Sequence, residues 1–120
     1  MFIYADPLKL SQVLRNLLYN AINHTPEDST IIVSLKFKDD HTVRLSVTNP
    51  GTPISEEDKK IIWERYQRSQ HQSGRRMGTG IGLSIVSTIL DAHGMKYGVD
   101  SDEKGTTFWF EITESGSGQF

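Results

Sequence analysis

Residues 12–26 read QVLRNLLYNAINHTP, and the remainder of the chain is organised around this stretch. A helix turning by about 100° per residue would gather a broad apolar face, formed by Leu10, Val13, Leu14, Leu17 and Ala21. The spacing of Asn16, Asn20 and Asn23 places all three on a neighbouring stripe of that helix. Asparagine is a poor helix former because its amide competes for backbone hydrogen bonds. The stripe is therefore either a solvated polar edge or a row of ligands for a hydrated cation such as Mg²⁺ and its anionic partner.

The composition indicates one globular domain. The chain has 120 residues, 36% of them hydrophobic, and a net charge of -2, with a mean hydropathy of -0.43 and a pI near 6.0. This length allows one core, and the charge argues against a nucleic-acid partner, which would favour a basic surface. The absence of cysteine excludes disulfides and thiolate metal sites. No apolar run reaches the ~20 residues of a membrane span and no signal-peptide pattern is present, so we expect a cytoplasmic domain.

Turn-forming residues and hydrophobic periodicity divide the chain into helices and strands. Asp6-Pro7 begins the first helix and Pro26 ends it. Gly94 suits the left-handed position after the third helix. The expected elements, in order, are a short edge strand at 2–4, the first helix, a hairpin of strands at 31–37 and 42–48, a helix at 55–67, a mobile loop at 67–79, a helix at 80–93, strands at 97–101 and 106–112, and a disordered tail at 114–120.

Two of these elements have a predicted buried side. The strand at 42–48 alternates apolar and polar residues, which turns Val43, Leu45 and Val47 towards the core. The helix at 55–67 starts with a serine cap and an acidic first turn. Its expected buried side chains are Ile61, Ile62, Trp63 and Tyr66.

Residues 78–83 read GTGIGL and open the third helix. Glycines let a backbone approach a ligand closely, and a helix N-terminus presents free N–H groups to an anion. A turn that merely needs glycine explains the same pattern equally well. A Rossmann motif is excluded because it must follow a strand, and a polar loop precedes the glycines here. Arg68, Arg75 and Arg76 in that loop are either ordinary surface charges or cations for a phosphate chain.

Five segments in order, NLLYNAINHT, VTNPGTPI, IWERYQR, GTGIGLSIV and GTTFWFEI, resemble the ATP-binding catalytic domain of sensor histidine kinases. The resemblance runs from Ala5 to Ile112. It implies a two-layer α/β sandwich shared with gyrase, Hsp90 and MutL, the Bergerat-type ATP-binding fold. In that fold a mixed, mostly antiparallel sheet of about five strands would pack on three helices. The domain would cover residues 1–113.

The resemblance implies that ATP and Mg²⁺ are the cofactors. Asn20 would take the metal ion with Asn16 assisting, and these two residues together with Arg68 would be the catalytic groups. The implied cofactor-binding residues are Asn16, Asn20, Asn23, His24, Asn49, Gly51, Ile54, Tyr66, Arg68, Gly78, Thr79, Gly80, Ile81, Gly82, Leu83 and Thr106.

The chain departs from the family pattern where the adenine ring is expected to bind. Relatives usually read DxGxG, whereas Asn49 and Pro53 replace the aspartate and the last glycine here. An uncharged acceptor gives up about 1 kcal/mol against a charged one, and an amide can rotate to donate. We therefore expect weaker ATP binding and looser discrimination against guanine. Asn23 stands where many relatives carry Lys or Arg, and Trp63 and Tyr66 replace two phenylalanines.

The resemblance also implies a mechanism. ATP-hydrolysing members of the fold carry a glutamate where this chain has Asn16, and an amide cannot act as a general base. The site would hold Mg-ATP with its γ-phosphate exposed, so that positioning and charge neutralisation carry the transfer. The phosphoacceptor histidine of the family lies on a separate dimerisation domain, and its sequence setting is absent around the four histidines of this chain, His24, His41, His71 and His93.

We therefore expect a domain of a longer, membrane-anchored sensor, attached to the membrane only through regions outside this sequence. Its partners would be its own dimerisation domain and, indirectly, a response regulator. In isolation it should not autophosphorylate. Two alternatives are a degenerate nucleotide-binding or scaffolding domain and a serine kinase of the anti-sigma-factor type.

Overall fold

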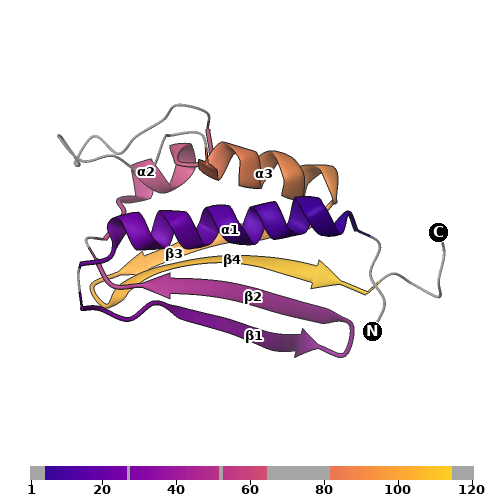
Figure 1. The fold of residues 1–120 in the computed structure, drawn as a ribbon, viewed down its shortest axis with the longest axis horizontal. Coiled ribbons are helices and arrows are strands. Elements are labelled where there is room, and N and C mark those ends of the chain that lie inside the picture. Colours follow the sequence, from indigo (N-terminus) through magenta and orange to yellow (C-terminus); the bar gives the residue numbers. More distant parts are fainter. Residues whose placement is uncertain (1–4, 27, 52, 65–81, 115–120) are drawn as a thin grey trace.

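A computed structural model describes residues 5–26, 28–51, 53–64 and 82–114, and it shows helices covering one face of a single sheet (Figure 1). This arrangement is the expected two-layer α/β sandwich. The elements are α1 (Pro7–His24), β1 (Ile32–Asp39), β2 (Thr42–Asn49), α2 (Glu56–Ile61), α3 (Gly82–Ala92), β3 (Tyr97–Asp102) and β4 (Gly105–Thr113).

The described strands form a four-stranded sheet in the order β1-β2-β4-β3. Every pairing among the described strands is antiparallel, in agreement with the expected mostly antiparallel sheet. Each tight hairpin pairs its own two strands antiparallel, and β4 then pairs with β2 from Thr42↔Thr113 to Asn49↔Thr106. The count of about five strands included residues 2–4, which lie outside the described part of the chain.

Local chemistry sets the ends of α1 and α3 where the sequence predicts them. The Asp6 carboxylate caps α1 by accepting from the backbone N–H of Leu8 at 2.9 Å and of Lys9 at 3.2 Å. After α3, Gly94 has φ +68°. Its N–H donates to the Asp91 carbonyl while the Met95 N–H donates to the Leu90 carbonyl, which is a Schellman motif.

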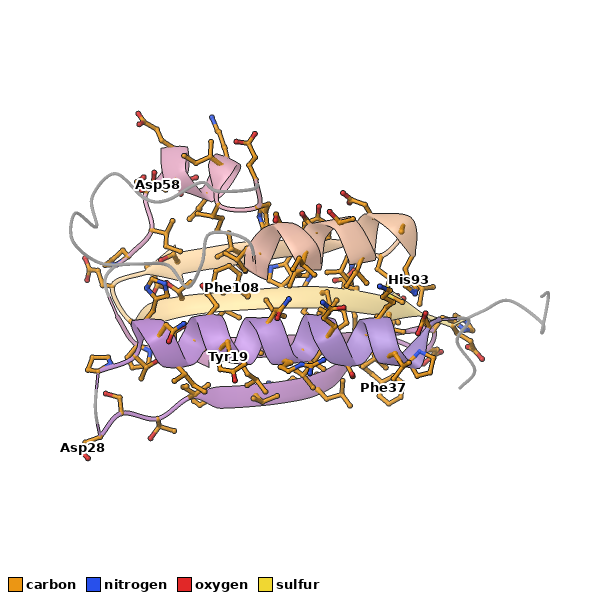
Figure 2. All side chains as sticks on the ribbon, turned by 45° about the horizontal axis from the view of Figure 1, so that its top comes forward. Tyr19, Asp28, Phe37, Asp58, His93 and Phe108 are labelled. Carbon is orange, nitrogen blue, oxygen red and sulfur yellow. The ribbon has the colours of Figure 1, made fainter. Side chains whose placement is uncertain are left out.

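The core lies between the helix layer and the sheet, and Figure 2 shows Phe108 there. The predicted inward face of β2 is confirmed by Val47, which is fully buried, and by Leu45, which packs against the core. The fully buried apolar side chains, with less than 2% exposure, are Val13, Leu17, Ala21, Val47, Val86, Leu90, Phe108 and Phe110. Among the described residues, no helix has the length and hydrophobicity to cross a bilayer.

Strand β1 lies at the sheet edge, where the helices leave it largely uncovered (Figure 1). Val33, Leu35 and Phe37 pair with the core-facing residues of β2 and share their face of the sheet. They are nevertheless 51%, 65% and 70% exposed, respectively. The apolar face of the sheet thus extends beyond the described helices.

Helix α2 is shorter than predicted. Ser55 caps it as expected, accepting from the Asp58 N–H at 3.1 Å, but the helix ends at Ile61 and not near residue 67. The chain turns after Ile61 because Trp63 packs edge-to-face against Tyr97, at 4.9 Å between ring centroids, and Phe108, at 5.6 Å. Ile62 and Trp63 therefore contribute to the core as predicted, whereas Tyr66 lies outside the described residues.

The last described residue, Glu114, is the first residue of the predicted tail, and it contacts the β1–β2 turn. Its backbone N–H donates to the His41 carbonyl at 2.7 Å, and its carboxylate lies 2.9 Å from the His41 Nδ1. These contacts extend the β4 side of the sheet to the β1–β2 turn. Residues 115–120 lie outside the described part.

Candidate functional site

Helices α1 and α3 meet where the asparagine stripe faces the start of α3. The half-buried Asn16 donates from Nδ2 to the carbonyl oxygen of Gly82 at 3.4 Å. Gly82 is the first residue of α3. This contact brings together two motifs that are 66 positions apart in the chain, and it leaves the Asn16 Oδ1 as an acceptor for a ligand.

The asparagine stripe divides into covered and exposed members. Asn20 is only 7% exposed, whereas Asn23 is exposed. The interpretation of the stripe as a solvated polar edge therefore fits Asn23, which is exposed, but not Asn20, which is buried. A buried amide is costly unless it is hydrogen-bonded or binds a ligand, which makes Asn20 the residue of the stripe that most needs a function.

A second group of predicted site residues gathers where β2 ends beside the start of β4. Asn49 is 3% exposed and its ladder partner Thr106 is 4% exposed. The Asn49 Nδ2 donates to the Pro50 carbonyl at 2.8 Å, which leaves Oδ1 as the acceptor. Gly105, with φ +150°, lets β4 approach so closely that an added Cβ would lie 2.5 Å from the Asn49 carbonyl oxygen. Only glycine fits there.

The loop after β2 passes over the end of α1. Gly51 has φ +149°, and a Cβ added there would lie 3.1 Å from the His24 carbonyl oxygen. His24 itself is half-buried. The Ile54 side chain packs against the core, and its backbone N–H donates to the Ser101 Oγ at 2.8 Å. The loop is thereby fixed to both layers of the fold.

Ser101 lies among the predicted site residues, although no sequence pattern singled it out. Its hydroxyl accepts from Ile54 and lies 2.8 Å from the Thr106 Oγ1, so it joins the loop to β4. Position 101 follows Tyr97 and Val99 on the inward face of β3. A serine at an inward position of a strand was the signal that could have identified it.

The remaining predicted site residues are not brought together by the described structure. The Leu83 side chain is buried in the core, so only its backbone could reach a ligand. Six further residues lie outside the described part of the chain, and these are Tyr66, Arg68, Gly78, Thr79, Gly80 and Ile81.

Neutral amides and hydroxyls provide the polar groups of this site. The described residues include no group of three or more His, Asp and Glu side chains that could hold a metal ion. On the opposite face of the sheet, Arg44 and then Lys38 hold the pKa of the buried Glu111 carboxylate below its ordinary value. The described site residues are thus suited to binding and orientation more than to proton transfer.

Comparison with known proteins places this geometry in a family. Residues 5–116 match the model of the histidine kinase-, DNA gyrase B- and HSP90-like ATPases. The sensor histidine kinase CusS of Escherichia coli strain K12 is 42% identical over 107 residues, which cover 88% of this chain and 22% of CusS. The chain thus spans less than a quarter of that relative's length.

Solved structures agree with this assignment. The catalytic domain of histidine kinase ThkA superposes with a TM-score of 0.78 at 37% identity, over 93% of this chain and 70% of that chain. The structure of ThkA in complex with the response regulator protein TrrA superposes with a TM-score of 0.77 at 34% identity, over 98% of this chain and 32% of that chain. The chain therefore belongs to the histidine kinase-, DNA gyrase B- and HSP90-like ATPase family, and its fold is that of the ATP-binding catalytic domain of sensor histidine kinases.

Proposed function

We propose that this domain holds Mg-ATP between α1 and the start of α3 and presents the γ-phosphate to a histidine on a separate dimerisation domain. The observation that carries the proposal is the contact of Asn16 with the Gly82 carbonyl, one helical turn from the buried Asn20. It sets the Asn16 carboxamide against the N-terminus of α3, whose free N–H groups favour phosphate, and Asn20 follows one turn later on α1.

The carboxamide pair fits a magnesium ion. Mg²⁺ prefers oxygen ligands, keeps several waters and shares phosphate oxygens, so one or two protein oxygens are sufficient. Because the Asn16 Nδ2 already donates to Gly82, its Oδ1 can face the ion or a bound water. When bound, the ion would neutralise phosphate charge. Asn20 would be the direct ligand and Asn16 the assisting one.

The adenine ring is proposed to lie at the β2–β4 end. The Asn49 Oδ1 would accept from the adenine amine, in place of a carboxylate. The hydrogen bond from its Nδ2 to the Pro50 carbonyl holds the amide in this orientation. This lock favours adenine over guanine and argues against the looser discrimination expected from sequence. Weaker binding than with a charged acceptor is still expected.

The phosphoacceptor is proposed to come from elsewhere in a longer protein. His41 pairs with Glu114, and His93 contacts the Asp6 N–H and the Ile89 carbonyl, so both rings are engaged structurally. Asn16 cannot act as a base for water, and slow ATP hydrolysis is therefore expected. The ThkA–TrrA complex supports a response regulator as the downstream partner. A membrane-anchored sensor with this domain in the cytoplasm is the proposed context.

Calorimetric titration of Mg-ADP tests the binding part of the proposal. We expect Asn20→Ala to weaken binding about tenfold or more, because lost contacts to charged groups cost about 1.5–3 kcal/mol. Arg15→Ala, on the exposed side of α1, is the matched control and should bind like the wild type. Absence of any thermal stabilisation of the wild type by Mg-ADP would support a degenerate scaffold instead.

Labelled ATP tests the phosphotransfer part. The isolated chain should remain unlabelled, and adding the dimerisation domain of a relative such as CusS should yield acid-labile phosphohistidine on that domain. Substantial labelling of this chain alone would contradict the proposal. Acid-stable phosphoserine on an added anti-sigma-type substrate, with no phosphohistidine, would favour the serine kinase alternative.

A further inference from the structure

His93, directly after α3, joins two distant segments through both nitrogens of its ring. Its Nδ1 lies 2.8 Å from the Ile89 carbonyl oxygen, and its Nε2 lies 3.1 Å from the backbone nitrogen of Asp6. Asp6 is the residue that caps α1. Figure 2 shows His93 at the end of the molecule where α1 begins and α3 finishes. The ring therefore connects the end of one helix with the start of the other.

The chemistry of the two partners determines one protonation state of the ring. A carbonyl oxygen can only accept, so Nδ1 must carry the proton. A backbone N–H can only donate, so Nε2 must present its lone pair. His93 is thus a neutral imidazole with the proton on Nδ1, the tautomer that an exposed histidine in water populates less.

The contact with Asp6 is the specific contribution of the ring. The end of α3 is already capped by the Gly94 and Met95 N–H groups, and the Ile89 carbonyl also accepts from the His93 backbone at 3.1 Å. Removing the ring would therefore leave the helix end intact. What would be lost is the hydrogen bond that ties α3 to the first residue ahead of α1.

The hydrogen bond from Asp6 to His93 lies at the end of α3, whereas the candidate site lies at its start. Val13 and Leu17 of α1 belong to the same apolar core as Val86 and Leu90 of α3, and such packing is not directional. Directional contacts occur at both ends, from His93 to Asp6 and from Asn16 to Gly82. At 3.4 Å the Asn16 contact is close to the limit of a hydrogen bond, so a small slip of α3 along α1 would break it.

We propose that His93 is a positioning residue that fixes the axial register of α3 against α1 and thereby holds the start of α3 against Asn16 and Asn20. The inference deepens the proposed function, since its consequence is nucleotide affinity. Without the tie, only a fraction of molecules have the competent register, and apparent affinity falls by that fraction.

Two substitutions test the roles of the two ring nitrogens separately. His93→Gln can place an oxygen acceptor near the position of Nε2, and His93→Asn can place a donor near Nδ1 but cannot reach Asp6. We expect His93→Gln to bind Mg-ADP within about twofold of wild type, and His93→Asn and His93→Ala to bind about three- to tenfold more weakly. All variants are the 120-residue chain, compared at a temperature where circular dichroism shows them folded.

Nuclear magnetic resonance tests the tie without nucleotide. Long-range ¹H–¹⁵N spectra of the wild type should show a protonated Nδ1 and an unprotonated Nε2 for the ring whose signals disappear in His93→Gln. Exchange of the Asp6 amide hydrogen should be slowed in the wild type and in His93→Gln, and faster in His93→Asn.

The proposal is overturned by an Nε2-protonated ring, or by equal Mg-ADP affinity in all the variants, or by rescue with His93→Asn and not with His93→Gln. If the wild type fails to bind Mg-ADP, the proposed function fails. The ring tautomer and the Asp6 exchange would still decide whether the tie exists.

Discussion

The two ends of the proposed nucleotide site are built in different ways. At the β2–β4 end, Asn49 and Thr106 are buried in a strand ladder, and Ser101 bonds the loop to that ladder. At the α1–α3 end, the described contact is one long hydrogen bond from Asn16 to Gly82. We call these the base end and the phosphate end. The base end is part of the folded sheet, whereas the phosphate end depends on how two helices sit side by side.

The difference predicts how each end responds to mutation. Changes at the base end should reduce the free energy of unfolding and nucleotide affinity together, because the same hydrogen bonds serve both. Changes at the phosphate end should reduce affinity with little effect on stability.

Gly105→Ala should be the most damaging change at the base end. The new Cβ would lie 2.5 Å from the Asn49 carbonyl oxygen at a φ of +150°. We expect the free energy of unfolding, measured in urea, to fall by about 3 kcal/mol. Gly94→Ala is the matched control, since its φ is +68° but nothing lies within 4 Å of an added Cβ. The Gly94→Ala variant should lose about 1 kcal/mol of its free energy of unfolding. Equal losses would show that steric approach at Asn49 is unimportant.

Ser101→Ala should reduce stability less than Gly105→Ala does, but it should lower both stability and Mg-ADP affinity. It removes the acceptor of the Ile54 N–H and the partner of the Thr106 hydroxyl, and an unsatisfied buried group costs about 1–3 kcal/mol. We expect lower stability by chemical denaturation and weaker Mg-ADP binding. Ser46→Ala, at an outward position of β2, is the control. Loss of stability with unchanged binding would separate Ser101 from the nucleotide site.

Glu111 lies outside both ends of the proposed site, where it pairs with Arg44 near the far end of the β2–β4 ladder from Asn49, and its effect on stability should depend on pH. The Arg44 Nε donates to its carboxylate at 3.0 Å, and Lys38 lies 3.2 Å away, so the pKa of Glu111 is lowered from its ordinary value of 4.5. A lowered pKa stabilises the fold above about pH 4.5, and this stabilisation is lost as the pH falls through the folded-state pKa.

The stability difference between wild type and Glu111→Gln should therefore be largest near neutral pH and shrink in acid. Denaturant unfolding at a series of pH values measures it. Lys104→Gln, a change in the exposed β3–β4 turn, provides a control whose effect should not follow this pattern. A difference that stays constant down to pH 3 would contradict the assigned role of the Arg44–Glu111 pair.

Asn16→Ala should have the smallest effect on stability and a clear effect on binding. The hydrogen bond of Asn16 is long and only part-buried, so we expect the free energy of unfolding to fall by less than about 1 kcal/mol. Mg-ADP affinity should fall about tenfold, because the phosphate end loses its assisting oxygen. A stability loss as large as that of Ser101→Ala, without a loss of affinity, would reverse the comparison of the two ends.

Local chemistry allowed much of the fold to be predicted from sequence. Asp6 and Pro7 begin α1, Gly94 ends α3, and the alternation in β2 turns Val47 inward, since each depends on neighbouring residues. Strand order and the end of α2 were not predictable in this way. The packing of Trp63 on Tyr97 and Phe108 joins segments far apart in the chain.

The same distinction applies to the candidate site. Periodicity identified the asparagine stripe but could not show that Asn20 is covered while Asn23 is exposed. The base-end residues came from the family resemblance, which carried no information on Ser101 or on the Pro50 carbonyl that orients Asn49. Contacts between distant segments decide these details.

Paramagnetic broadening by Mn²⁺ in place of Mg²⁺ tests the central claim most directly. With ADP and Mn²⁺ added to ¹⁵N-labelled protein, we predict that the side-chain amide signals of Asn20 and Asn16 and the backbone signal of Gly82 broaden most, while Leu35 at the sheet edge is unaffected. Broadening that spares Asn16 and Asn20, or that requires no nucleotide and centres elsewhere, would contradict a metal-bound nucleotide held between α1 and α3.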